Sequence, residues 1–307
     1  MREMHGSGTL FCIASAAAFG AMGVVGKLAY GEGATVGTLL SVRFVLAAAL
    51  FWLVLACTGR ARELRSLPRR DMVIAVALGA VGYGAQAGSA FAALDRLDPA
   101  LFSLLLYTYP VLVAVAAIVL RREPASRRTT TALVLASGGL ILVLAGAAAG
   151  AVDAIGAVLA FGAAAVYTAY ILSSEGVAGR VDPLVLSTLL CTGAATTLTL
   201  GALAGGDLHL GSVSPKGFGW LATLAVVSTV GAITLFFAGL RRVGPTSTAI
   251  LSTFEPVVTV ALAFVVFGGT LGVAQLAGGA LVLAAVLLVR APVQARLVRP
   301  RLARETA

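Results

Sequence analysis

Charged residues are scarce in this sequence. Asp, Glu, Lys and Arg together make up only 11% of the 307 residues, whereas 59% are hydrophobic and the mean hydropathy is +1.00. A soluble domain usually carries about 25% charged residues. One aqueous core cannot bury so large an apolar fraction, so the composition predicts a protein whose surrounding solvent is lipid.

The sequence also has few groups for metal, redox or acid–base chemistry. Its three cysteines, Cys12, Cys57 and Cys191, lie in separate apolar runs without paired spacing, and its two histidines are His5 and His209. This pattern favours small packing residues over a disulfide framework or a zinc site. No catalytic triad, paired-carboxylate motif, P-loop or dinucleotide-binding motif is present. We therefore expect no metal, no cofactor and no enzymatic activity.

Long apolar runs are abundant instead. A bilayer core of about 30 Å needs about 20 apolar residues per helix. Ten runs of this kind cover residues 8–29, 34–57, 72–94, 99–120, 129–148, 152–173, 182–205, 216–239, 245–267 and 271–290. The sequence therefore predicts an all-α membrane protein with ten transmembrane helices. The first run is too long for a cleaved signal peptide, and residues 291–307 are expected to form a disordered basic tail.

Arginine indicates the orientation of these helices. With the N-terminus inside the cell, the connectors and tail on the cytoplasmic side hold 18 of the 22 Lys and Arg residues. Lys27, Arg96 and Lys216 remain outside, and Arg43 lies within a run. Because cationic loops resist translocation, this asymmetry predicts that both termini are cytoplasmic. It also accounts for the net charge of +9 without nucleic acid as a partner.

Two segments 146 residues apart repeat one pattern. The segment "FAALDRLDPALFSLLLYTYPV" begins at Phe91 and "FAGLRRVGPTSTAILSTFEPV" begins at Phe237, and they align without a gap. The matches that carry most weight are Phe91, Arg96, Pro99 and Pro110, which recur as Phe237, Arg242, Pro245 and Pro256. A weaker match at a shift of 148 joins Gly8 to Gly156 and Phe19 to Tyr167. The chain therefore reads as two related halves, residues 1–148 and 149–290.

Each half contains five predicted spans. Since five is odd, the second half enters the membrane from the opposite face. Loop charge agrees with this inversion, because residues 95–98 read "DRLD" and their counterparts at 241–244 read "RRVG". Inverted repeats are typical of secondary transporters, in which the two halves rock around a central site.

These features resemble one family. The repeated five-span unit, the connectors "ALDRLDPA" and "GLRRVGPT", and the segments "YP…RREP" and "EP…FGG" are similar to the EamA family of the drug/metabolite transporter superfamily, over about residues 8–290. Glu123 keeps the acid that often follows the proline-bearing span, whereas Gly269 of the second copy is not followed by one. The resemblance implies ten helices, cytoplasmic termini, and a central cavity lined mainly by spans one, three, four, six, eight and nine. It also implies transport of metabolites, often amino-acid export, or of drugs.

Proline recurs at two depths in the repeated segment. Pro99 and Pro245 suit the first turn of a helix, where the missing N–H costs nothing. Pro110 and Pro256 come eleven residues later, which is about 16 Å along a helix and near mid-membrane. A proline there bends the helix and frees a carbonyl that lipid cannot satisfy. We expect both prolines to act as hinges beside the binding site, with static packing kinks as the alternative.

Glu255, immediately before Pro256, is the most informative single residue. An ionised carboxylate at the bilayer centre costs on the order of several kcal/mol unless it is paired or hydrated. We expect Glu255 to face the cavity, where it binds a cationic group of the substrate or a coupling proton. The alternative is that it hydrogen-bonds the backbone that Pro256 frees.

Other polar side chains fall near mid-depth in the apolar runs. The candidate substrate-binding residues besides Glu255 are Tyr83, Gln86, Tyr107, Tyr109 and Tyr167. Their hydroxyls and rings suit small amphipathic ligands, although each is equally compatible with ordinary bonds between helices. Arg43 is expected to serve as a structural clamp or as a site charge. Lys27 is expected to extend its ammonium group to the membrane surface.

The sequence thus predicts a multi-pass protein of a bacterial cell membrane that transports a small molecule. The leading hypothesis is an exporter of amino acids or related metabolites that works by alternating access, and coupling to protons through Glu255 stays open. The alternatives are a multidrug efflux transporter and, in another class, a channel or a non-transporting scaffold. The expected partners are the small-molecule substrate and membrane lipid. Nucleic acid is not expected as a partner, and the sequence leaves open whether the protein forms a homodimer.

Overall fold

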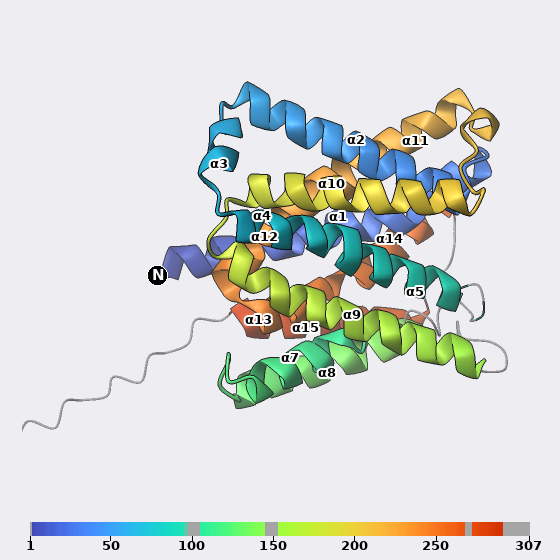
Figure 1. The fold of residues 1–307 in the computed structure, drawn as a ribbon. Helices are drawn as coiled ribbons and strands as arrows, with labels where there is room; N and C mark the ends of the chain where they lie inside the picture. The colour runs from blue at the N-terminus through green and yellow to red at the C-terminus, as the bar shows by residue number, and fades with distance from the viewer. Residues whose placement is uncertain (1, 95, 97–104, 145–152, 268–271, 291–307) are drawn as a thin grey trace, which may run out of the picture.

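The computed structural model describes residues 2–94, 96, 105–144, 153–267 and 272–290. Within these ranges the chain forms helices and the loops that connect them, and none of the described residues lies in a strand. The long helices run along a common direction and pack side by side (Figure 1). The expectation of an all-α protein is confirmed for the described residues.

The helices of the first half follow the apolar runs closely. They are α1 (Arg2–Gly31), α2 (Val36–Cys57), α3 (Ala61–Ser66), α4 (Arg69–Ala77), the π-helical η1 (Leu78–Tyr83), α5 (Gly84–Leu94), α7 (Tyr109–Val119) and α8 (Arg127–Leu144). The short helix α3 was not predicted, and it lies in the arginine-rich connector after α2.

The second half repeats this order. Its elements are α9 (Ala154–Ala178), α10 (Pro183–Ala204), the 3-10 helix η2 (Leu210–Ser212), α11 (Pro215–Ala225), the π-helical η3 (Val226–Gly231), α12 (Ala232–Val243), α13 (Pro245–Ser252), α14 (Phe254–Phe267) and α15 (Val273–Arg290). The two π segments begin 148 residues apart, at the shift that relates the earlier parts of the two halves. Each replaces regular α-helix in the middle of a predicted span.

Six helical segments in the described part of the chain are long and apolar enough to cross a membrane. They are Ser7–Gly31, Val36–Cys57, Arg69–Ala90, Ala154–Ala178, Pro183–Ala204 and Pro215–Val243. The count of ten spans and the placement of both termini in the cytoplasm stay predictions. The basic tail, residues 291–307, lies outside the described residues.

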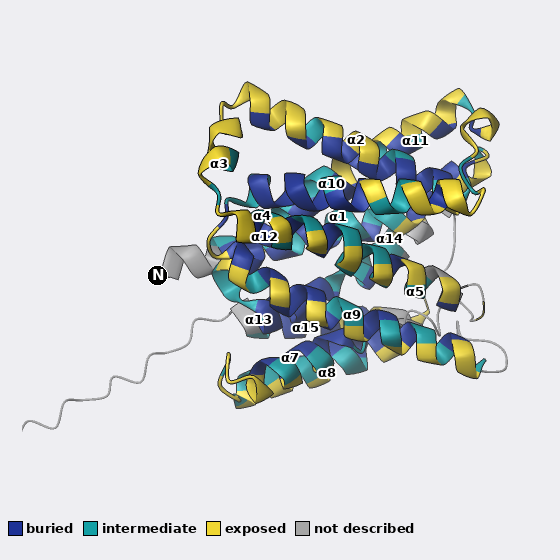
Figure 2. Ribbon diagram, viewed as in Figure 1, coloured by how far each residue is buried: buried dark blue, intermediate teal, exposed yellow. Residues whose placement is uncertain are grey.

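The outer surface of the bundle is apolar. Large hydrophobic side chains that are more than half exposed include Leu53, Val73, Val81, Val158, Val265, Val273 and Leu287. Buried positions follow the inward faces of the helices, and exposed ones follow the outward faces (Figure 2). A surface of this kind would aggregate in water but is suited to contact with acyl chains.

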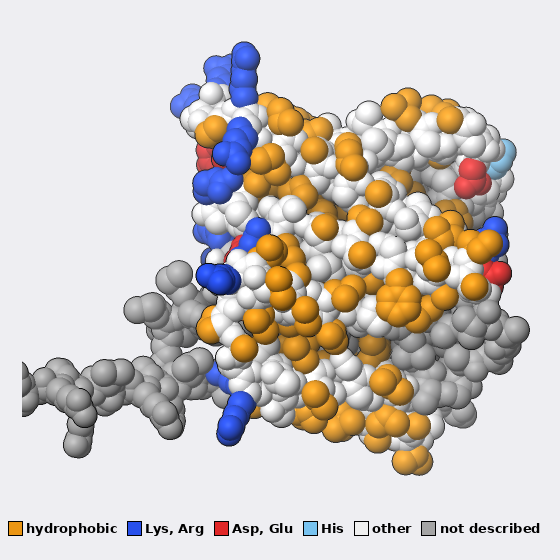
Figure 3. Space-filling model, turned by 60° about the horizontal axis from the view of Figure 1, so that its bottom comes forward, with side chains coloured by type: hydrophobic (Ala, Val, Ile, Leu, Met, Phe, Trp, Pro, Cys, Tyr) orange, Lys and Arg blue, Asp and Glu red, His pale blue; other side chains and the backbone are white. Residues whose placement is uncertain are grey.

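Lys and Arg side chains gather at one end of the molecule, the end that carries α3 (Figure 3). Exposed arginines of the α2–α4 connector, including Arg60, Arg62 and Arg65, contribute to this end. The arrangement has the asymmetry that the sequence predicted.

Helices α2 and α10 are joined at both of their ends. At the end away from α3, the Thr35 hydroxyl donates a hydrogen bond to the Asp207 carbonyl (2.7 Å), and the Gly37 amide donates to the Asp207 carboxylate (2.7 Å). At the α3 end, Arg60 pairs with Asp182 at 3.1 Å. Thr35 and Asp182 are also the N-caps of α2 and α10. The same two helices are therefore held together by equivalent cap residues at opposite ends.

Ion pairs lie beside these joints. Lys216 is 3.2 Å from Glu32 at the far end, and Arg180 is 2.7 Å from Asp71 at the α3 end. The acid belongs to the first half of the chain in both pairs, and the base to the second.

A close crossing fixes α10 against the third span. A Cβ atom on Gly79 would overlap the carbonyl oxygen of Leu190, and one on Gly193 would overlap the carbonyl oxygen of Val76. Glycine at both positions lets the backbones approach as they do at small-residue interfaces in membranes.

Candidate substrate-binding cavity

A cavity of about 140 Å³ lies between helices of both halves. Its lining residues are Phe19, Met22, Tyr83, Gln86, Leu106, Tyr107, Tyr109, Tyr167, Tyr170, Ile233, Phe236 and Glu255. They belong to α1, η1, α5, α7 with the residues just before it, α9, α12 and α14. These elements correspond to spans one, three, four, six, eight and nine, the set that the family resemblance implies.

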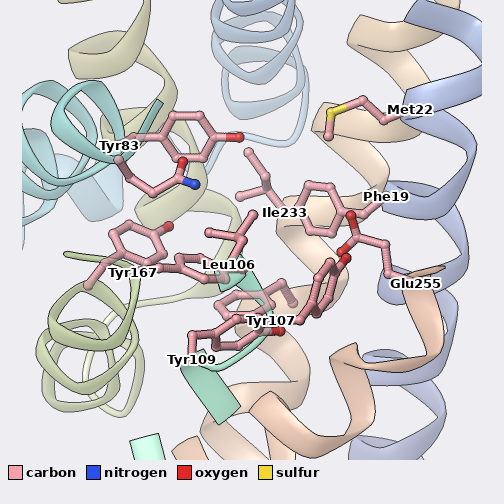
Figure 4. A pocket seen from close by; sticks show the side chains of 12 residues that line it. Phe19, Met22, Tyr83, Leu106, Tyr107, Tyr109, Tyr167, Ile233 and Glu255 are labelled. Carbon is pink, nitrogen blue, oxygen red and sulfur yellow. The ribbon is translucent and has the colours of Figure 1, made fainter. Parts of the chain in front are cut away.

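All six residues that the sequence singled out for substrate binding line this one cavity: Tyr83, Gln86, Tyr107, Tyr109, Tyr167 and Glu255. Tyr83 and Tyr167 lie on one side, and Phe19, Met22 and Glu255 lie on the other (Figure 4). Their roles stay predictions, because proximity to a cavity does not by itself show that a residue binds a ligand.

Five tyrosine rings form a continuous wall. The ring centroids of Tyr109 and Tyr167 are 4.6 Å apart in an edge-to-face contact, and those of Tyr167 and Tyr170 are 5.9 Å apart and stacked. Tyr107 extends the wall beyond Tyr109 at 5.8 Å, and Tyr83 extends it beyond Tyr170 at 6.4 Å. Tyr167 and Tyr170 share one face of α9 because residues three apart are neighbours on a helix. The wall offers aromatic faces and hydroxyls to a ligand.

Glu255 is the carboxylate of the cavity. It is the second residue of α14, where free backbone N–H groups and the helix dipole favour negative charge. Its carboxylate points into the cavity beside Phe19 (Figure 4), and the Tyr107 hydroxyl donates a hydrogen bond to it. This placement agrees with the expectation that Glu255 faces the cavity, whereas its proton or substrate role is not tested by geometry.

The prolines beside the cavity lie in the first turns of α7 and α14, each directly after a short break in the helix. Pro110 is in the first turn of α7, and Pro256 follows the break between α13 and α14 at Thr253. Tyr107 and Thr108 form the corresponding turn before α7. The disturbance is therefore a short break just before each proline, and Thr108 and Thr253 keep right-handed helical dihedrals there. The hinge role of both prolines stays a prediction.

Only one of the two outer prolines, Pro99 and Pro245, lies within the described residues. Pro245 begins α13 in the expected first turn, whereas Pro99 lies outside the described residues.

Arg43 is buried behind the cavity and does not line it. Its side chain on α2 is 2% exposed. The guanidinium donates to the Thr229 hydroxyl (2.6 Å) and the Ser228 carbonyl (3.3 Å), both in η3, and its Nη1 lies 2.7 Å from the Met22 sulfur. These contacts fit the expected clamp, and the contact with Met22 brings the charge next to the cavity wall.

The remaining residues of interest lie away from the cavity. Lys27 is exposed near the end of α1, and the extension of its ammonium group to the membrane surface stays a prediction. Cys12 and Cys191 are buried and Cys57 is exposed, and all three are free thiols.

Sequence reasoning missed the other lining residues, namely Phe19, Met22, Leu106, Tyr170, Ile233 and Phe236. Five of the six are apolar, and an apolar side chain in an apolar run carries no sign of facing a cavity. Tyr170 could have been found from its position three residues after Tyr167, on the same helical face.

The comparison with known families is decisive at this point. The sequence profile of the EamA-like transporter family matches residues 6–145 and matches again at residues 154–291. The chain belongs to the EamA-like transporter family. Membership makes this protein a multi-pass membrane transporter built from two family domains, and the resemblance seen in the sequence is confirmed.

Comparisons with individual proteins extend the match to nearly the whole chain and to the fold. This EamA-like transporter is 27% identical over 278 residues to the uncharacterized transporter YcbK of Bacillus subtilis (strain 168), and the match covers 89% of each chain. A chain of known crystal structure superposes with a TM-score of 0.77 at 19% identity, covering 92% of this chain and 96% of that one. The second likeness shows the fold alone.

Proposed function

We propose that this EamA-like transporter is a secondary active transporter of small metabolites in the cell membrane, and specifically an exporter of amino acids or related compounds. The observation that carries the proposal is the cavity between the two halves, which combines one carboxylate with a wall of tyrosines. Glu255 would bind the ammonium group of the substrate or a coupling proton, and the tyrosines would contact its apolar part.

The size of the cavity supports a small substrate. Its volume is about 140 Å³. Pockets for drug-sized ligands are commonly about 300–1,000 Å³. Multidrug efflux, the second candidate, would require the cavity to expand, so a small metabolite fits better.

Alternating access would follow from the repeated architecture. We propose that the two halves, residues 1–148 and 149–290, are inverted with both termini cytoplasmic, and that they rock around the cavity. The breaks before Pro110 and Pro256 are the proposed hinges, because both interrupt a helix directly beside the lining residues. A homodimer is compatible with this scheme but is not required by it.

The test is counterflow in proteoliposomes against a panel of amino acids, related metabolites and cationic drugs. We expect saturable exchange of at least one small metabolite and a response to an imposed pH gradient. Flux that does not saturate would indicate a channel, and absence of flux for every compound would indicate a scaffold. Exchange of the drugs alone would favour multidrug efflux.

Glu255→Gln is the first variant to test. Loss of the carboxylate should lower exchange by at least about tenfold, as expected for losing a hydrogen bond to a charged group in a dry site. Glu63→Gln, on exposed α3, is the matched control and should exchange substrate at the wild-type rate. Wild-type exchange and an unchanged pH profile in Glu255→Gln, at equal expression, would contradict the role of Glu255.

A further inference from the structure

Arg43 is a buried charge without a described counter-ion. The ion pairs among the described residues do not include it, although only 2% of it is exposed. A guanidinium has five N–H donors and does not lose its proton. Two described oxygens, of Thr229 and Ser228, accept from Arg43. The guanidinium also contacts the weakly accepting sulfur of Met22, and its Cζ lies 5.0 Å from the centroid of the Phe44 ring. Donors on the Met22 side therefore lack a strong acceptor.

The fold does not require a charge at this crossing. The equivalent position in the second half, 148 residues later, is Cys191 on α10. Helix α10 packs against η1 as α2 packs against η3, but it does so through Gly79 and Gly193. A clamp needed to stabilise a π segment would be expected at both crossings. Its presence at one crossing only points to a role in the site.

Met22 separates Arg43 from the cavity. The same Met22 side chain contacts the guanidinium and lines the cavity on the side where Glu255 lies (Figure 4). Methionine is unbranched and changes rotamer at low cost. A rotation of Met22 would open a path between the guanidinium and the ligand.

We propose that Arg43 is the anion-binding part of the substrate site. When Met22 turns aside, the guanidinium binds a carboxylate of the substrate, and Glu255 binds a cationic group. The two charges select a small zwitterion with a free carboxylate over the corresponding amide or amine. The proposal rests on the proposed transport function and narrows its substrate class.

The experiment compares matched probes that differ in the carboxylate. Counterflow is measured for the standard L-amino acids and for their carboxamides, for example L-leucine and L-leucinamide. In the wild type, we expect the acid to be preferred over its amide by at least about tenfold, the worth of a charge-assisted bond. Arg43→Gln should reduce this preference to about twofold or less, because it lowers exchange of the acid more than exchange of the amide, and Arg43→Lys should retain part of the preference.

Thr229→Val separates this role from a structural one. It removes a partner of Arg43 in η3 but keeps the charge, so the preference for the acid should persist. If Arg43 only holds η3, then Arg43→Gln and Thr229→Val will both lower thermal stability and reduce acid and amide exchange alike, which would overturn the proposal.

The remaining outcomes are also distinct. Equal exchange of acid and amide by the wild type, or an unchanged preference in Arg43→Gln, would refute the carboxylate site and leave the transport function intact. Exchange of neither probe type by the wild type would contradict the proposed function, and this inference with it.

Discussion

At the scale of single residues, charge was the signal that the sequence could provide. Glu255 and Arg43 stand out because an ionised side chain is costly inside an apolar run, and the structure brings the first to the cavity and the second behind Met22. Phe19 and Ile233 gave no such signal, because a side chain that faces a cavity and one that packs against a neighbour are chemically the same. Local sequence therefore marked the polar part of the candidate site and missed most of its apolar wall.

Gly79 offers a prediction at this scale. A Cβ at this position would overlap the Leu190 carbonyl, so Gly79→Ala must push α10 away from η1. We expect a loss of about 1–3 kcal/mol in the free energy of unfolding, as for overpacked interiors, seen as a lower unfolding temperature in detergent. Gly138→Ala is the control, since nothing lies within 4 Å of a Cβ there. Equal stability of the two variants would mean that the crossing is looser than described.

At the scale of elements, the positions of the helices were predictable and their interruptions were only partly so. Apolar runs of about 20 residues located the spans because bilayer thickness sets helix length. The prolines marked where the fourth and ninth spans are disturbed, but a smooth bend and a short break in the helix have the same local sequence. The π segments η1 and η3 gave no signal, because their glycines and β-branched residues are also common in regular transmembrane helices.

The η3 segment allows a length-dependent test. Deleting Val227 should convert η3 to regular α-helix, because a π segment takes up one extra residue locally. Ile233 and Phe236 would keep their orientation, whereas the Ser228 and Thr229 oxygens that accept from Arg43 would move, so counterflow should fall severalfold. Val227→Leu keeps the length and should retain exchange. Elution of both variants as single species in detergent would show that folding is preserved; exchange at the wild-type rate by the deletion variant would show that the π turn is dispensable.

At the scale of the whole molecule, the two halves are joined by complementary contacts at opposite ends. Thr35 and Asp182 cap α2 and α10 and bind the connector after the other helix. The internal match in the sequence indicated that such correspondences exist, but not which residues meet, because contacts between the halves depend on how they pack.

Glu32 leads to a prediction about pH. The hydrogen bonds from the Ser214 hydroxyl and from Lys216 hold the pKa of Glu32 below its ordinary value of 4.5. A carboxyl with a lowered pKa in the folded state adds stability above the ordinary pKa, and that stability is lost as the pH falls through the folded value. Glu32→Gln should therefore lower the unfolding temperature at neutral pH, and the difference from wild type should disappear in strong acid. Glu63→Gln serves as the control, and a difference that grows on acidification would contradict this assignment.

The ion pairs at opposite ends of the bundle also make its two ends chemically distinguishable. When the bundle spans a bilayer, the ion pair of Glu32 and the ion pair of Asp71 would face the aqueous compartments on opposite sides. Acid added to the outside of a sealed vesicle would protonate one of these two carboxylates and leave the other ionised. Because each face carries one such acid, both faces of the wild type would respond. In Glu32→Gln only the face with Asp71 would respond, and that face would report which way the chain is inserted.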